Sequence, residues 1–159
     1  PGDLDVGVLL YLAARGVDLA QLNEDLNYRS GLLGLSGVSA DMRELLTLEK
    51  QGHAGARRAV DAFCQRARKY LGAYLALLNG ADAIVFGGGI GEHAHAVRAR
   101  ICAGMDWCGI ALDEHANQTA DGTPARVSAS ASRIAVYVIP VDEEALIARD
   151  AHLCLARDH

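Results

Sequence analysis

The stretch from Ala83 to His93 constrains the fold more than any other part of the chain. It reads Ala-Ile-Val-Phe-Gly-Gly-Gly-Ile-Gly-Glu-His, so an apolar run typical of a strand meets four glycines within five positions. A helical pattern follows over residues 93–107. Glycine has no Cβ to hinder a ligand, and a helix N-terminus adds unpaired N–H groups and a positive dipole end. This order predicts either a phosphate or nucleotide site or a tight turn without a ligand.

Two common nucleotide motifs do not fit this stretch. A P-loop is excluded because no Gly-Lys-Ser/Thr follows the glycines. The dinucleotide fingerprint fits poorly, because Glu92 stands where that motif has its third glycine.

Composition limits the class of protein. The chain has 159 residues, of which 51% are hydrophobic and 22% charged, which is ordinary for a soluble globular domain. A net charge of −5 and the lack of a basic run with interleaved aromatics argue against a nucleic-acid partner. No apolar span of 18 residues and no secretory pattern occur, so we expect no membrane association and a cytoplasmic location. The four cysteines lie singly, which is typical of small core residues rather than of metal ligands.

The chain predicts an α/β fold, because helical patterns alternate with strand patterns. Strands are expected at 84–86, 109–112, 126–130 and 134–139, and residues 30–39 and 115–124 are expected as loops. The predicted helices span residues 2–15, 19–26, 41–46, 54–78, 93–107 and 142–153. Asp3 or Asp5, Asp18, and Asp41 or Ser39 are candidate N-caps of the first three. We find no repeat or linker and expect one domain over residues 1–159, which opens on Pro-Gly-Asp-Leu-Asp as if cut from a larger protein.

Three further places can carry chemistry. Asp142, Glu143 and Glu144 follow a predicted strand, where carboxylates suit Mg²⁺, although N-capping alone also explains them. Arg43 can bind a nucleotide phosphate or base, or can form a surface salt bridge. The Gly-Asp-Leu-Asp segment at residues 2–5 is the third place. His93 and His95 lie two positions apart on a helix start and point in different directions, which argues against a metal site.

Together, several segments of the chain resemble the acetate kinase family, in the order and with the spacing of that family. They are Gly2-Asp3-Leu4-Asp5, Ser30–Gly37, Asp41-Met42-Arg43, Phe86–Glu92, Arg98, Val138-Ile139-Pro140, Glu143-Glu144 and Ile147-Ala148-Arg149. The resemblance covers essentially all 159 residues and the C-terminal two fifths of the family. It implies the C-terminal part of a ribonuclease-H-like, actin-like ATPase domain, with a mixed sheet and flanking helices.

The resemblance also implies a function. Acetate kinases transfer the γ-phosphate of ATP to acetate and give acetyl phosphate and ADP, reversibly. By position, Asp41, Met42 and Arg43 are similar to the family's nucleotide contact. Gly89, Ile90, Gly91, Glu92 and His93 are similar to its adenosine loop, and Glu143 to its Mg²⁺ carboxylate. A homodimer formed through this part of the protein is implied as well.

The chain departs from the family pattern at a few positions. His93 replaces the usual Asn, Gly87-Gly88 replaces a more common Thr-Ala, and Asp142 stands where Asn is usual. The family's acetate pocket, catalytic residues and main phosphate motif correspond to positions before Pro1, so no residue of this chain is predicted to be catalytic. We therefore expect the isolated chain to be inactive. Propionate kinase, or an ATP-binding module without catalysis, remain the alternatives.

Overall fold

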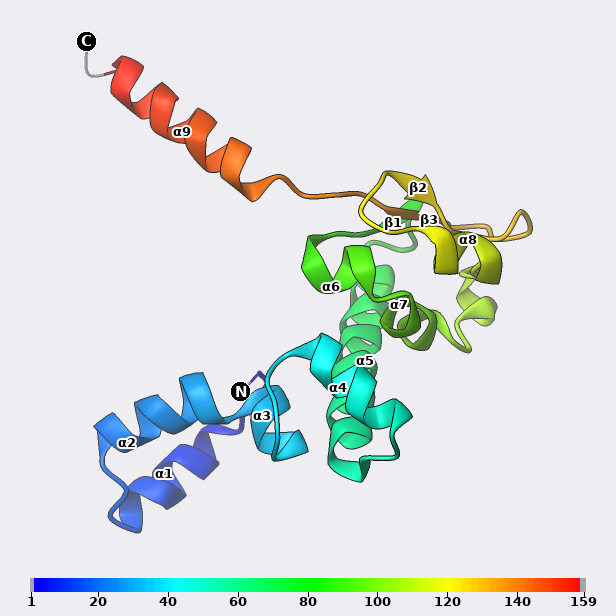
Figure 1. Cartoon of the computed structure of the whole chain (residues 1–159). Coiled ribbons are helices and arrows are strands. Elements are labelled where there is room, and N and C mark those ends of the chain that lie inside the picture. The colour runs from blue at the N-terminus through cyan, green and yellow to red at the C-terminus, as the bar shows by residue number, and fades with distance from the viewer. Residues whose placement is uncertain (1, 158–159) are drawn as a thin grey trace. The chain divides into compact units, whose positions relative to one another are not determined.

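The computed structural model describes residues 2–157 and leaves aside the side chains of residues 143, 144, 146 and 155–157. The chain divides into two compact units, Pro1–Ala73 and Tyr74–His159 (Figure 1). Helix α5 (Ala54–Leu77) begins in the first unit and ends in the second. The expectation that residues 1–159 act as one domain stays a prediction.

All regular secondary structure in the described part of the first unit is helical. Its elements before α5 are α1 (Val6–Ala14), α2 (Leu19–Glu24), the π-helical turn η1 (Asp25–Arg29), α3 (Gly31–Ser36) and α4 (Met42–Lys50). The caps follow the sequence: the carboxylates of Asp5, Asp18 and Asp41 accept backbone N–H bonds at the starts of α1, α2 and α4. The expected loop at 30–39 was wrong in part, because residues 31–36 form α3. Gly37 ends that helix in the left-handed region, at φ 74°.

The core of the first unit is formed by residues of α2, α4 and the N-terminal half of α5. Its buried apolar side chains are Leu22, Met42, Leu45, Ala56, Ala59, Val60 and Cys64. The end of α3 contacts the start of α5 so closely that a Cβ on Gly55 would lie 2.3 Å from the carbonyl oxygen of Ser36. Glycine at position 55 therefore permits this packing.

The segment before α1 is held on α5 by one carboxylate. Asp3 accepts hydrogen bonds from Arg66 (3.3 Å), Lys69 (2.9 Å) and the hydroxyl of Tyr70. These donors, with Tyr70 first, lower the pKa of Asp3 to about 2.

The second unit is built on a small mixed sheet of β1 (Ala83–Phe86), β2 (Ala125–Arg126) and β3 (Ala135–Val138), in the order β1-β3-β2. β1 and β3 are parallel, with Phe86 opposite Val138, whereas β2 is antiparallel to β3. This confirms an α/β fold with a mixed sheet. The predicted strand at 84–86 is present as β1, and those at 126–130 and 134–139 are present as β2 and β3 but shorter than expected. The strand expected at 109–112 is reduced to a single bridge between Leu112 and Ser128.

The helices of the second unit differ most from the sequence prediction. They are α6 (Gly88–His93), α7 (His95–Cys102), the 3₁₀ turn η2 (Asp106–Cys108), α8 (Glu114–Thr119) and α9 (Glu143–Arg157). The single helix predicted over 93–107 was wrong: helix begins inside the glycine run, and Ala94 breaks it at ψ 74°. The loop predicted at 115–124 contains α8, because Asp113 caps it through the N–H of Ala116.

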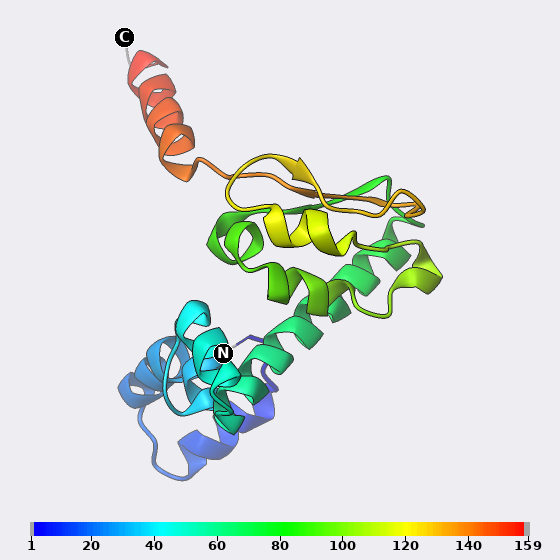
Figure 2. The ribbon, with the colours of Figure 1, turned by 45° about the vertical axis from the view of Figure 1, so that its right-hand side comes forward.

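Helices α6, α7 and α8 lie along one side of the sheet (Figure 2). The buried apolar side chains of this unit include Val97, Ile101, Met105, Ile110, Val127, Ile134, Val136 and Val138. In the part of the chain that the structure describes, no helix is long and apolar enough to cross a membrane.

Candidate nucleotide site

The glycine turn stands where the carboxyl ends of two parallel strands meet. β1 ends at Phe86 and β3 at Val138, which are paired, and the N–H of Ile139 donates to the carbonyl oxygen of Phe86 at 3.0 Å. The predicted nucleoside residues follow β1, and Glu143 follows β3. In open α/β sheets this edge is the usual place of a ligand.

At three of the four glycines in the turn, the protein itself explains why the residue has no side chain. A Cβ on Gly87 would lie 2.8 Å from Cγ2 of Val141, and one on Gly91 would lie 3.3 Å from the carbonyl carbon of Phe86. Gly88 has φ +69°, which L side chains rarely adopt. Gly89 differs, because it is exposed and a Cβ there would meet nothing within 4 Å. Neither backbone conformation nor packing thus requires a glycine at position 89.

The helix that follows the turn is too short for the dipole argument made from the sequence. α6 contains six residues, and its neighbour α7 begins only after the break at Ala94. The positive end of a helix dipole grows from aligned peptide units, so six of them supply little. Access to the backbone, rather than a strong dipole, is what this turn offers to a ligand.

A buried arginine holds the turn from beneath. Arg98 is fully buried, and its guanidinium donates to the carbonyl oxygens of Gly91 and Glu92, both at 2.8 Å. It also donates to the side chain of Asn117 at 2.7 Å and to the carbonyl oxygens of Asn117 and Ala120 at 2.6 and 3.0 Å. The last carbonyl groups of α6 and α8 are thereby satisfied by one cation. Burial lowers the pKa of Arg98, and the nearby charge of Asp121 opposes this effect.

His93, which stands in place of the family's Asn, is turned toward acidic groups. Its Nδ1 contacts Oδ1 of Asp121, and its Nε2 lies 4.0 Å from Oε2 of Glu92. The imidazole is about half exposed. His93 is therefore held at the rim of the turn, with part of its ring open to solvent.

Glu92 has a partner that the sequence did not indicate. Its side chain is only 11% exposed, and Oε1 accepts a hydrogen bond from the backbone N–H of Val141 at 3.0 Å. Val141 follows β3 and lies two residues before Glu143. The glycine turn and the segment that carries the predicted metal carboxylate are thus joined directly.

The predicted metal residue is placed only in its main chain. Glu143 is the first residue of α9, and its side chain lies outside what the structure describes. Asp142 caps α9, because its Oδ1 accepts from the N–H of Ala145 at 2.9 Å. Among the described residues, no three His, Cys, Asp or Glu side chains gather into a metal site. A single carboxylate still suits Mg²⁺ bound together with a nucleotide, because phosphate and water oxygens fill the other positions.

The Asp41-Met42-Arg43 group lies in the first unit, at the start of α4. The side chain of Arg43 is 89% exposed and pairs with Asp41 through Nη2 at 2.6 Å and Nε at 3.2 Å. This pairing lowers the pKa of Asp41 to about 2 and raises that of Arg43. Met42 is buried in the core of the unit. The guanidinium is therefore the part of this group that is most open to a ligand.

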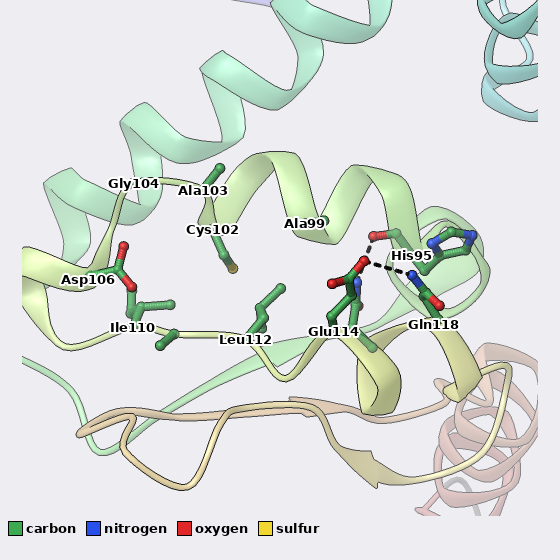
Figure 3. Close-up of a pocket in the computed structure, with 12 residues that line it drawn as sticks. His95, Ala99, Cys102, Ala103, Gly104, Asp106, Ile110, Leu112, Glu114 and Gln118 are labelled. Carbon is green, nitrogen blue, oxygen red and sulfur yellow. Dashed lines mark hydrogen bonds between the residues drawn. The ribbon is translucent and has the colours of Figure 1, made fainter.

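Sequence reasoning missed the roles of Arg98, Asn117 and Val141. Arg98 lies on a helix between the buried residues Val97 and Ile101, which is the one signal for its burial in the sequence. The second unit also holds a cavity of about 280 Å³, lined by α7, α8 and the chain between them (Figure 3). None of the residues predicted for the nucleotide or the metal lines it.

Comparison with known proteins shows what this chain is similar to. Residues 1–149 match the acetokinase family. The chain is 49% identical over 160 aligned positions to acetate kinase from Chloroherpeton thalassium and 47% identical over 156 to that from Solibacter usitatus. These alignments cover 98% and 97% of this chain but 38% of each relative. The chain thus spans about two fifths of the length of the curated relatives it matches.

Solved structures show the same relation. The crystal structure of Porphyromonas gingivalis acetate kinase matches with a TM-score of 0.88 and 40% identity, over 97% of this chain and 39% of that one. A propionate kinase from Francisella tularensis matches with a TM-score of 0.81 and 31% identity, over 90% and 36%. These matches confirm the predicted fold as part of an actin-like ATPase fold. The chain therefore belongs to the acetokinase family.

Proposed function

We propose that this chain is the C-terminal, nucleotide-binding part of an acetate kinase, which in the intact protein transfers the γ-phosphate of ATP to acetate. The observation that carries the proposal is the junction of the glycine turn with the end of β3. There Glu92 accepts from Val141, so the predicted nucleoside residues and the predicted metal residue meet at one sheet edge. Family membership supports the kinase chemistry.

Gly89, Ile90, Gly91 and His93 form the surface that the nucleoside contacts. Gly89 is the point of closest approach, because nothing in the protein occupies the space of its missing side chain. A glycine within a helix costs about 1 kcal/mol relative to alanine, so a ligand that needs the open backbone accounts for its presence.

Arg43 supplies the positive charge for the nucleotide. Its guanidinium is oriented by Asp41 and is largely exposed. An arginine fork suits a phosphate or a purine edge through paired N–H donors. Asp41 serves as both cap and orienting group, which keeps the fork close to the start of α4.

Glu143 would hold the metal. When bound, Mg²⁺ would neutralise negative charge on the phosphate oxygens. The residues of this chain then bind the nucleoside, orient the arginine and fix the metal carboxylate at the end of β3. Phosphoryl transfer depends on such positioning and on charge stabilisation.

The test is an assay of the intact protein with ATP and Mg²⁺, trapping the acyl phosphate with hydroxylamine. We expect turnover with acetate and a lower kcat/KM with propionate. The match to a propionate kinase supports the second candidate, which a higher kcat/KM with propionate would favour. Nucleotide binding without transfer to either acid would favour an ATP-binding module.

A further inference from the structure

Glu92 lies in the nucleoside loop, yet its carboxylate is turned into the protein. The residue is 8% exposed and stands three positions after Gly89. Burial of a carboxylate costs free energy unless hydrogen bonds within the protein replace those it made to water. Its partners therefore indicate what it does.

Those partners are few and specific. Oε1 accepts from the N–H of Val141 at 3.0 Å, and Oε2 lies 4.0 Å from the ring of His93, which itself contacts Asp121. Arg98 bonds the backbone carbonyl oxygen of Glu92. No salt bridge of the Glu92 carboxylate with a lysine or arginine is among the interactions of the described residues, so an ion pair does not account for it.

Among the described residues, Val141 makes the last hydrogen bond between the turn and the chain before α9. Ile139 donates to the carbonyl oxygen of Phe86, and Pro140 has no N–H to donate. The N–H of Val141 is the next available donor, and Glu92 binds it. The side chain of Val141 also lies against Gly87, since a Cβ on Gly87 would be only 2.8 Å from Cγ2 of Val141. Glu143 follows after one further residue, so the position of Val141 fixes where the chain delivers Glu143.

We propose that Glu92 is a positioning residue, which couples the nucleoside loop to the metal carboxylate by holding the N–H of Val141. The inference rests on the proposed function in that it assigns Mg²⁺ to Glu143. Glu92 acts through the main chain and contacts neither metal nor nucleotide. The path from the loop to Glu143 consists of this one hydrogen bond and two residues of chain.

Three variants of the intact kinase separate this role from a direct one. Glu92→Gln keeps an accepting oxygen at the same reach but loses the charge, whereas Glu92→Asp keeps the charge but is too short to reach Val141. Glu92→Ala removes both. Glu114→Ala is the matched control, because Glu114 is an exposed glutamate of the same unit with one side-chain bond, to Gln118.

The first measurement is hydrogen exchange in peptides that cover residues 139–142. We expect the amide of Val141 to exchange at least tenfold faster in the Asp and Ala variants, and within twofold of the parent in Gln and in the control. The second is ADP affinity by calorimetry with and without Mg²⁺. The Asp and Ala variants should lose at least fivefold of the Mg²⁺-dependent gain in ADP affinity, whereas the Gln variant and the control should keep that gain within twofold of the parent.

The proposal is overturned if Gln is as impaired as Ala while Asp behaves like the parent, since that pattern belongs to a charge that acts directly. Unchanged exchange at Val141 in the Asp variant overturns it as well, even if the Ala variant fails to fold. A parent protein that binds no nucleotide refutes the proposed function instead, and the exchange data still report on the hydrogen bond.

Discussion

At the scale of residues, the glycines of the turn separate into two kinds. A side chain at Gly87 or Gly91 would crowd Val141 or Phe86, and Gly88 has a positive φ, so substitution at these three positions disturbs the turn itself. Gly89 is exposed with open space around its α-carbon. It is the position at which ligand approach can be tested without disturbing the protein.

We expect Gly89→Ala to weaken ATP binding at least tenfold, or about 1.4 kcal/mol, because the added methyl group occupies the space of the nucleoside. The same change should leave the unfolding temperature equal or higher, since alanine favours helix by about 1 kcal/mol. Calorimetry and thermal unfolding of the intact protein check both parts. Gly72→Ala, in α5 and likewise without neighbours, is the control. Unchanged affinity in Gly89→Ala would remove the ligand from this turn.

Arg98→Met should cost about 3 kcal/mol or more of unfolding free energy, because four carbonyl groups and the Asn117 amide lose their donor within a buried site. Arg98→Lys should cost nearly as much, since an ammonium cannot reproduce the planar fork. Denaturant unfolding measures both. Arg126→Met is the control, because Arg126 is exposed and donates to Ser128. A loss below about 1 kcal/mol in Arg98→Met would show that water replaces these bonds.

At the scale of elements, the segment before α1 is docked on α5 by the carboxylate of Asp3, which accepts hydrogen bonds from side chains of that helix. The pKa of Asp3 is lowered from 3.8 to about 2 in the folded chain. A lowered pKa means that docking of this segment is stabilised above pH 3.8 and that the stabilisation is lost as pH falls through about 2. The segment should therefore stay docked across the neutral range.

We expect an NMR titration of the Asp3 carboxyl to show a pKa of about 2, and Tyr70→Phe to raise it toward 3.8, because the Tyr70 hydroxyl is the largest cause of the shift. Tyr11→Phe, in α1, should leave it unchanged. The stability difference between the parent and Asp3→Asn should be present at pH 6 and vanish on acidification. A midpoint at 3.8 or above in the parent would contradict the docking of Asp3 on α5.

At the scale of the whole molecule, the residues predicted for the site do not account for transfer of the phosphoryl group to acetate. The predicted residues supply a nucleoside loop, an arginine and one metal carboxylate, but none that is expected to bind the acid. Loss of a single charge-stabilising group already costs about 10²–10³ in rate. The residues predicted in this chain lack more than one such group, so the expected loss of rate is larger.

The 159-residue chain alone should therefore make no acetyl phosphate. Hydroxylamine trapping with ATP, Mg²⁺ and acetate tests this, with the intact kinase as the positive control. Turnover within tenfold of the intact enzyme would show that the catalytic residues have been misplaced.

We also expect a homodimer. No residue of α1 is buried although the helix is strongly apolar, and Leu77, at the end of α5, is 80% exposed. Exposed apolar side chains such as these suit contacts between two copies of the chain. Light scattering should give twice the mass of one chain, and Leu77→Asp should weaken association at least tenfold. Leu19→Asp, in α2 and 81% exposed, is the control. A monomer at micromolar concentration, or an equal effect of both variants, would contradict an interface on α5.

The sequence by itself determined the elements whose signals are local. The cap at Asp18 and the long helix α5 follow from residues within one or two turns. The caps at Asp5 and Asp41 were each one of two candidates, and the structure decided between them. The short helices α3 and α8 were not predicted, because polar and glycine-rich stretches are compatible with a loop as well as with a helix, and tertiary packing selects between the two. The glycine turn was found as a stretch, but its four glycines could not be told apart.

Only the tertiary structure decided how the candidate site is held together. Arg98 can be buried because acceptors arrive from α8, about twenty positions away, and Glu92 meets Val141 across 49 positions. Burial of a charge depends on all of its partners at once, and no local pattern records partners that the fold brings from elsewhere. Residue types therefore revealed the chemistry that this chain can offer, while the sheet edge decided which of those residues contact one another.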